Sequence, residues 1–293
     1  MSFTTQSGQA VMMDGKALAK EERERLKAEV ADFTEKYGFP PGLAVVLVGN
    51  DPASIDYSGV LVRHAREYGM HALHHVLPSG ISFEQFSEEI AGMNADKSIH
   101  GISIQWPVPG IDQSHATLTL DPRKDVEGYH PISTGKLFSG SDTFIPATPL
   151  GGLRLLEHYG YKLYGKLCLV VGFGVTVGRP LTALLIAAGA TPVVAHLPTP
   201  RETLVKLGLE ADFIFGAAGA AHLITGEMVK PGAVVVDFGM SFKEGKMYGD
   251  VEIESVKRVA QAVTTSPSVS GRLTSIALLE NVLKAAQQQM EQL

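Results

Sequence analysis

Three polar side chains lie where a ligand-binding surface is expected. Tyr57 follows the aliphatic run 43–48, Gln105 ends the short apolar run 101–104, and Glu127 lies further on, in PRKDVEGYHP. Tyr57 and Gln105 fall near predicted strand ends, where open α/β sheets bind their ligands. Two interpretations stay open for Gln105 and for Glu127. Gln105 could contact a ligand or bond backbone groups of its own loop, and Glu127 could contact a ligand or accept from local amides.

The glycine-rich segment GFGVTVGRP, residues 172–180, is a second place where chemistry is expected. It lies between an apolar strand, 167–171, and an apolar helix. Gly172, Gly174 and Gly178 would let the backbone approach a pyrophosphate, which the N-terminus of the helix attracts. The order of strand, glycine loop and helix therefore predicts a dinucleotide site.

A helix expected over 52–68 positions Tyr57. Its ends are marked by an N-cap, a first-turn proline and a terminating glycine, at Asp51, Pro52 and Gly69. On this helix Tyr57, Leu61 and His64 are spaced i, i+4 and i+7, so they share one face.

Alternating strands and helices predict an α/β fold with two domains. The expected strands are 43–48, 71–77, the start of 101–109, 167–171, 191–196, 211–219 and 233–238. The expected helices are 14–36, 52–68, 82–94, 150–159, the one that follows the glycine loop, and 275–289. We expect an N-terminal α/β domain over 1–147 plus 275–293, and a Rossmann-type, doubly wound parallel sheet over 148–274.

Composition excludes several classes of protein. The chain has 293 residues and a net charge of −6 without clustered Lys or Arg, which argues against a nucleic-acid or anionic-membrane surface. Cys168 is the one cysteine, so neither an internal disulfide nor a cysteine-based zinc site is expected. We expect no metal at His71, His74 and His75. Residues 1–26 contain no signal-peptide core and no apolar span, so we expect a cytoplasmic protein that acts on a small molecule.

Five segments resemble the bifunctional methylenetetrahydrofolate dehydrogenase/cyclohydrolase family. They are PGLAVVLVGNDPASIDY, Gln105 followed by WPVP, PRKDVEGYHP, PATP at 146–149, and 237–252. The resemblance implies that Tyr57 and Gln105 contact a folate substrate and that Glu127 contacts its pterin ring. It also implies that the final helix packs back onto the first domain and that the protein is a homodimer.

The resemblance implies NADP or NAD as the cofactor. In the glycine loop the family usually has a serine where this chain has Gly174, and the hydroxyl or basic side chain that relatives carry for the 2′-phosphate of NADP is replaced by Leu197. Arg179 could supply that charge or could instead close the start of its helix. The residues expected to bind the cofactor are Gly172, Gly174, Thr176, Val177, Gly178, Arg179, His196 and Thr274.

Departures from the family lie mainly where it binds folate. The family's lysine, four residues after the tyrosine, is Leu61 here, and the family's aspartate is Glu127. The family's glycine-rich folate loop reads TTSPSVSGRLT at 264–274, where Pro267 and Arg272 are candidate substrate-binding residues. Loss of a double glycine in that loop predicts a change of its shape.

These residues predict NAD(P)-dependent oxidation of 5,10-methylenetetrahydrofolate to 5,10-methenyltetrahydrofolate. The candidate catalytic residues are Tyr57, Gln105, Glu127 and His64. By resemblance the family's lysine serves the later hydrolysis, and Leu61 cannot transfer a proton, so cyclohydrolase activity is expected to be lost or impaired. His64 or Arg272 could restore it. Two alternatives stay open: a reprogrammed paralogue acting on another folate-like substrate or reaction, and a non-catalytic protein that binds folate or nucleotide.

Overall fold

The computed structural model describes residues 9–243, 246–265 and 269–291, and the chain divides into two compact units. The six-stranded unit is formed by the chain through Ala19 and by Ala147–Thr274. The three-stranded unit is formed by Lys20–Pro146 and Ser275–Leu293. The chain therefore passes from one unit to the other three times, and two of these crossings lie inside a helix.

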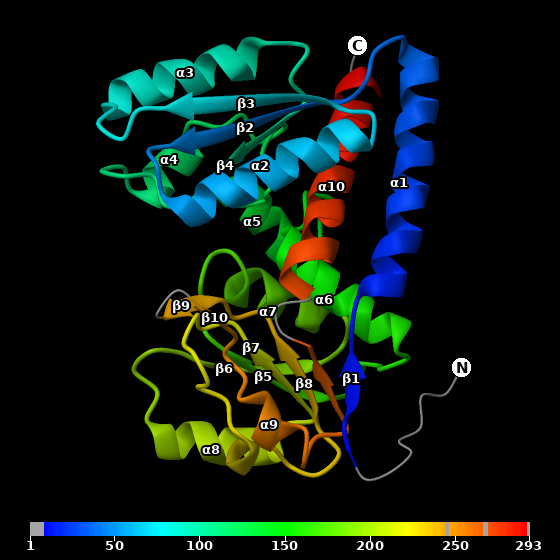
Figure 1. The fold of residues 1–293 in the computed structure, drawn as a ribbon, viewed down its shortest axis with the longest axis vertical. Coiled ribbons are helices and arrows are strands. Elements are labelled where there is room, and N and C mark those ends of the chain that lie inside the picture. Colours follow the sequence, from blue (N-terminus) through cyan, green and yellow to red (C-terminus); the bar gives the residue numbers. More distant parts are fainter. Residues whose placement is uncertain (1–8, 244–245, 266–268, 292–293) are drawn as a thin grey trace. The chain divides into compact units, whose positions relative to one another are not determined.

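The three-stranded unit is built on a parallel sheet with the strand order β3-β2-β4. Its strands are β2 (Gly42–Val48), β3 (His71–Leu77) and β4 (Gly101–Ile104). Its helices are α1 (Lys16–Tyr37), α2 (Pro52–Glu67), α3 (Phe83–Ala95), α4 (Gln113–Leu118), α5 (Pro131–Ser139) and α10 (Thr274–Glu291), of which α1 and α10 begin in the other unit. The helices α2 and α3 lie on opposite sides of the sheet (Figure 1).

The sequence explains these elements locally. Every residue of β2 is buried, as predicted for a strand covered on both faces. The carboxylate of Asp51 accepts from Ser54 N–H at 2.9 Å and so caps α2, and the expected cap of α3, Ser82, forms a capping box with Gln85. Phe86, Ile90 and Met93 of α3 then pack on one face of the sheet. These predictions are confirmed.

The six-stranded unit is built on a parallel sheet with the order β1-β11-β8-β7-β5-β6. Its strands are β1 (Val11–Met13), β5 (Leu167–Val171), β6 (Thr191–Ala195), β7 (Phe213–Gly216), β8 (Val234–Asp237) and β11 (Ala262–Thr264). Its helices are α6 (Ala147–His158), α7 (Gly178–Ala187), α8 (Arg201–Glu210) and α9 (Ile253–Val256), with a 3-10 turn at Gly226–Met228 and a π-helical turn at Val269–Leu273. An antiparallel pair, β9 (Ser241–Lys243) and β10 (Lys246–Tyr248), lies outside the main sheet.

The N-terminal boundary differs from the predicted domain 1–147. Strand β1 pairs in parallel with β11 of the six-stranded sheet, from Val11 opposite Ala262 to Met13 opposite Thr264. Met13 is fully buried there. A strand of three residues is too short for its pattern of side chains to reveal it, and its partner is about 250 residues further along the chain.

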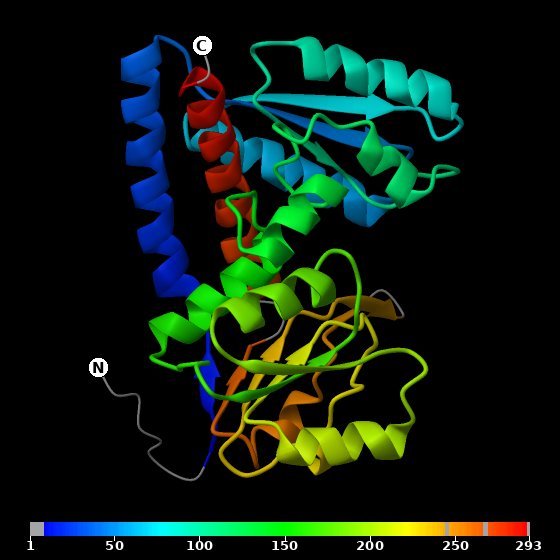
Figure 2. The ribbon, with the colours of Figure 1, turned by 180° about the vertical axis from the view of Figure 1, so that it is seen from behind.

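Helix α10 packs within the three-stranded unit beside α1, as both ribbon views show (Figures 1 and 2). Arg25 of α1 pairs with Glu280 of α10. The buried Asn281 donates through Nδ2 to the carbonyl oxygens of Val126 and Ile145, each at 2.8 Å. The predicted return of the last helix to the first domain is therefore confirmed, and Asn281 anchors it to the backbone next to Glu127.

We predict that Asn281→Ala lowers the free energy of unfolding of the three-stranded unit by about 2 kcal/mol, because two buried carbonyl groups lose their donor. The one tryptophan of the chain, Trp106, belongs to this unit, so its fluorescence during urea unfolding reports on the unit selectively. The exposed Gln287 on the same helix is the control, and Gln287→Ala should change the value by less than about 0.5 kcal/mol. Equal effects of the two substitutions would contradict the anchoring role.

Candidate functional site

The carboxyl ends of β2 and β4 form the expected ligand edge of the three-stranded sheet. From β2 the chain first builds β3 on one side and then β4 on the other, so the strand order reverses between β2 and β4. Open α/β sheets bind ligands at such a reversal. Tyr57 lies in the second turn of α2, which follows β2, and Gln105 is the residue after β4.

A chain of hydrogen bonds joins three side chains at this edge. Gln105 Nε2 donates to Ser103 Oγ at 2.9 Å, and Ser103 Oγ donates to Glu127 Oε1 at 2.6 Å. Ser103 and Gln105 are buried, and Glu127 is partly buried. Two of the predicted substrate-binding residues are therefore connected through a serine that sequence reasoning missed. The signal was present, because residues two apart on a strand face the same side.

The segment 124–130 holds Glu127 rigidly beside β4. Ile102 N–H donates to Lys124 O at 2.8 Å, and Ile102 forms an isolated parallel bridge with Asp125. The fully buried carboxylate of Asp125 accepts from the backbone N–H of Tyr129 and His130 and from Ser133 Oγ. Burial raises the pKa of Asp125 to about 6, although these hydrogen bonds lower it. Asp125 is thus a framework residue.

The electrostatics of the site are dominated by removal of water from the Glu127 carboxyl. Burial raises the pKa of Glu127 to about 7, the hydrogen bond from Ser103 lowers it, the charge of Asp125 raises it, and a hydrogen bond with Tyr129 lowers it. Burial and then the charge of Glu127 raise the pKa of Tyr57, so both of these groups share one environment and Tyr57 stays a neutral phenol. Tyr57, Ser103, Gln105, Glu127 and Tyr129 make up the site that the structure brings together.

The other two residues on the predicted face of α2 have different surroundings. Leu61 is fully buried. His64 Nδ1 lies 3.2 Å from Ser275 Oγ of α10, and its ring stacks on Tyr68. Burial lowers the pKa of His64, so its imidazole is neutral at neutral pH.

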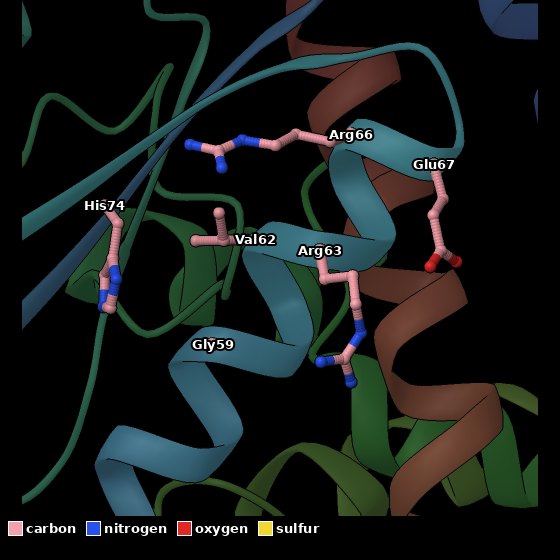
Figure 3. A pocket seen from close by; sticks show the side chains of 6 residues that line it. All are labelled: Gly59, Val62, Arg63, Arg66, Glu67 and His74. Carbon is pink, nitrogen blue, oxygen red and sulfur yellow. The ribbon is translucent and has the colours of Figure 1, made fainter.

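A separate, open pocket lies on another face of α2, next to β3. Figure 3 shows Arg66 extending toward β3, where its Nη2 donates to Ala72 O at 3.0 Å, while Arg63 and Glu67 point away from it. His74 lines the same pocket, and its Nε2 lies 3.1 Å from Ser58 Oγ. Arg63 is exposed on this face of α2, away from the face that Tyr57, Leu61 and His64 share.

In the six-stranded unit the glycine loop lies at a second reversal of strand order, between β5 and β7. Gly172 has a φ of +114°, and a Cβ there would lie 2.1 Å from Ala217 O, in the loop after β7. A Cβ on Gly178 would lie 2.2 Å from Gly172 O. By contrast, a Cβ on Gly174 would meet no atom within 4 Å. Two glycines therefore keep the turn closed, and the third leaves room for a ligand at the start of α7.

The remaining predicted cofactor residues differ in their exposure to solvent. Arg179 Nε donates to Phe173 O at 3.2 Å and its guanidinium lies over the Phe173 ring, which matches the helix-closing role. His196 and Leu197 are exposed after β6, and Leu197 is completely exposed. Thr274 is buried and donates to Thr148 Oγ1 at 3.4 Å, Val177 is buried, and Thr176 is exposed.

Two buried carboxylates hold the loop after β7, and sequence reasoning missed both. Asp250 accepts from the N–H groups of Ala218, Gly219 and Ala220 at 2.6, 3.2 and 2.7 Å. Asp237, the last residue of β8, accepts in turn from the N–H groups of Gly239, Asp250 and Val251. An acid that ends an apolar strand was the available signal for Asp237. The two residues fix the backbone that contacts Gly172.

Pro267 and Arg272 belong to the segment 264–274, which was predicted to bind the substrate. Pro267 lies outside the described residues, and Arg272 is exposed in the π-helical turn. Cys168 is a buried thiol. Within the described ranges no group of three or more His, Cys, Asp or Glu residues could hold a metal ion. No helix among those same residues has the length and apolarity needed to cross a membrane.

Comparison with known families covers most of the chain. Residues 13–127 match the catalytic domain, and residues 146–290 the NAD(P)-binding domain, of tetrahydrofolate dehydrogenase/cyclohydrolase. The bifunctional protein FolD of Aquifex aeolicus (strain VF5) is 44% identical over 278 residues, covering 94% of this chain and 95% of that protein. FolD of Roseiflexus sp. (strain RS-1) is 42% identical over 283 residues, covering 96% and 98%.

Solved structures agree with this match. The FolD methylenetetrahydrofolate dehydrogenase/cyclohydrolase from Campylobacter jejuni superposes with a TM-score of 0.90 at 37% identity and covers 96% of this chain and 99% of that one. The Trypanosoma brucei enzyme, solved with NADP and an inhibitor, has a TM-score of 0.92 at 29% identity, with coverage of 96% and 99%. This chain belongs to the tetrahydrofolate dehydrogenase/cyclohydrolase family.

Proposed function

We propose that the protein oxidises 5,10-methylenetetrahydrofolate to 5,10-methenyltetrahydrofolate with NADP or NAD as the acceptor. The observation that carries this proposal is the linked set of Gln105, Ser103 and Glu127 at the ligand edge of the three-stranded sheet. Family membership supports the choice of substrate, and the closed glycine turn with its open position at Gly174 fits a dinucleotide. A bound nicotinamide supplies the hydride acceptor.

The reaction requires a site that binds a heterocycle and tolerates the positive charge of the product. A C–H bond of the methylene bridge breaks, its two electrons leave with the hydride, and the folate product is a methenyl cation. Glu127, when ionised, can accept from N–H groups of the pterin, and Gln105 can orient the same ring. Tyr57 keeps its proton and can stack on the substrate or donate to it. None of these steps needs a proton to move.

Hydrolysis of the methenyl product differs, because water must be activated and protons must be moved. Leu61, fully buried and apolar, offers no such group. We therefore infer that cyclohydrolase activity is impaired. A rescue through His64 would have to use Nε2, since Nδ1 lies against Ser275, and a rescue through Arg272 would act by its charge.

A second function is favoured by the combined change at Leu61 and Glu127. Leu61 replaces an ammonium group with an apolar side chain, and Glu127 carries its carboxylate on a side chain that is one methylene longer. It is a reaction on another folate-like substrate with the same scaffold. Failure of methylenetetrahydrofolate to reduce either nucleotide, in a protein that still binds tetrahydrofolate, would favour it. Binding of nucleotide or folate without any turnover would favour a non-catalytic protein.

The homodimer and the cytoplasmic location stay predictions from the family. Light scattering of the purified protein during gel filtration tests the first, since a dimer doubles the mass of 31.3 kDa. Fractionation of the source cells tests the second.

We predict that the purified protein reduces NADP or NAD with methylenetetrahydrofolate and that methenyltetrahydrofolate accumulates. NAD(P)H and the methenyl product should be followed separately in one spectrophotometric assay. Leu61→Lys should increase the rate of methenyl hydrolysis at least about tenfold, the size expected for adding a proton-transfer group. Leu61→Met, of similar volume, should not. Prompt disappearance of the methenyl product in the unaltered protein would refute the hydrolysis defect.

We predict that Glu127→Gln lowers kcat/KM at pH 8 by about 10- to 100-fold, the loss expected for a charged hydrogen bond. Because the pKa of Glu127 is about 7, kcat/KM of the unaltered protein should rise as pH increases through 7, and Glu127→Gln should remove that inflection. Stability gives an independent check of sign. Between about pH 4.5 and 7 Glu127 keeps its proton in the folded state and loses it in the unfolded state, so the free energy of unfolding falls as pH rises through this range. Glu127→Gln should make that fall smaller. An unchanged inflection would show that Glu127 is not the titrating group.

We predict that Gly178→Ala weakens dinucleotide binding at least about tenfold, because its methyl group would displace the backbone at Gly172. The matched control is Gly174→Ser, which introduces the serine that the family usually has there and clashes with no atom of the protein, so binding should stay within about threefold. Fluorescence titration with NADP and with NAD measures both. A loss with Gly174→Ser as large as that with Gly178→Ala would contradict the special need for glycine at Gly178.

A further inference from the structure

Ser103 is the central member of the site network, and it has one hydrogen to donate. It is fully buried on β4, between the Gln105 amide and the Glu127 carboxyl. An ionised carboxylate can only accept hydrogen bonds. The single Ser103 hydrogen must then point to Glu127, so Ser103 Oγ can only accept from the Gln105 side.

The single hydroxyl hydrogen of Ser103 determines which atom of the Gln105 amide is left for a ligand. With Nε2 turned to Ser103, the carbonyl Oε1 of Gln105 is the remaining polar atom, and no described residue donates to it. The Glu127 carboxylate also keeps lone pairs beyond those used by Ser103 and Tyr129. Both side chains therefore offer acceptors, and the edge is suited to a ligand that carries N–H donors.

Protonation of Glu127 would reverse the chain of bonds. A neutral Glu127 can donate to Ser103, Ser103 can then donate to the Gln105 carbonyl oxygen, and the amide would turn its NH₂ outward. The titratable groups that face Glu127 are Asp125 and Tyr129 on its own segment and Tyr57 on α2. Tyr57 and Tyr129 keep their protons, because burial raises the pKa of each. Burial raises the pKa of Asp125 to about 6 and that of Glu127 to about 7, so Asp125 loses its proton first and Glu127 is the carboxyl that changes charge around pH 7.

We propose that Ser103 is a positioning residue that fixes the Gln105 amide and the Glu127 carboxylate as a pair of acceptors, so that the site selects ring systems with an amino or ring N–H edge. The identity of that ligand as a tetrahydrofolate rests on the proposed function. The orientation of Gln105 and the charge of Glu127 do not, since both exist in the protein without ligand.

The test in the ligand-free protein is the titration of the Glu127 side-chain carboxyl by carbon-13 NMR, with its signal assigned by Glu127→Gln. Ser103→Ala removes the donor that favours the charged form, so the midpoint should move up by about one pH unit. Ser103→Thr keeps a hydroxyl and should restore the midpoint. Ser58→Ala, which removes another fully buried hydroxyl in the same unit, is the control and should leave it unchanged. An unmoved midpoint in Ser103→Ala would overturn the proposal.

The second test measures ligand selection by calorimetry with tetrahydrofolate and with its 2-desamino-2-methyl analogue, which lacks the amino donor. The unaltered protein and Ser103→Thr should prefer tetrahydrofolate at least about tenfold, and Ser103→Ala should reduce that preference to within about threefold. An equal preference in Ser103→Ala would contradict the role of the serine. If neither compound binds the unaltered protein, the proposed function fails, whereas the NMR titration still decides whether Ser103 orients Glu127.

Discussion

The cost of keeping the Glu127 carboxyl out of water is the constraint on which the candidate site depends. A buried carboxyl is tolerated when hydrogen-bond donors surround it or when it takes up a proton. Here Ser103 and Tyr129 donate hydrogen bonds to the carboxyl, but the effect of burial is larger, so the pKa of Glu127 is raised to about 7. The frame around it, with Asp125 bonded to the backbone and Asn281 bonded to Val126 O, prevents the segment from relaxing toward solvent. The charge of the site is therefore adjustable near neutral pH.

The two reactions of the family make different demands on the buried site. Hydride transfer requires close positioning of two ligands and some compensation of charge, which fixed side chains can supply. Hydrolysis requires a group that exchanges protons with water. Leu61 removes the family's lysine from a position that is fully buried in this chain. In the proposed function, this change affects proton movement more than it affects the binding of the ring.

Much of the fold could be predicted from the sequence because its signals are local. The continuous apolar run of β2, the cap at Asp51 and the capping box at Ser82 each act within a few residues. Strand β1 could not be predicted, because its stability comes from β11 and not from its own three residues. At the candidate site, Tyr57, Gln105 and Glu127 were predicted from strand ends and resemblance. Ser103, Asp237 and Asp250 were missed, since a buried polar residue reveals its role only when its partners are known.

The pairing of β1 with β11 also has a consequence for how the protein is made. Val11–Met13 leaves the ribosome about 250 residues before its partner Ala262–Thr264. At ~5–20 residues per second, that interval is on the order of ten seconds or more. During that time the apolar strand β1 has no partner, whereas β8 is synthesised only about 25 residues before its neighbour β11. The nascent chain thus carries an unpaired β1 until β11 has been synthesised, so this edge of the six-stranded sheet cannot be completed before then.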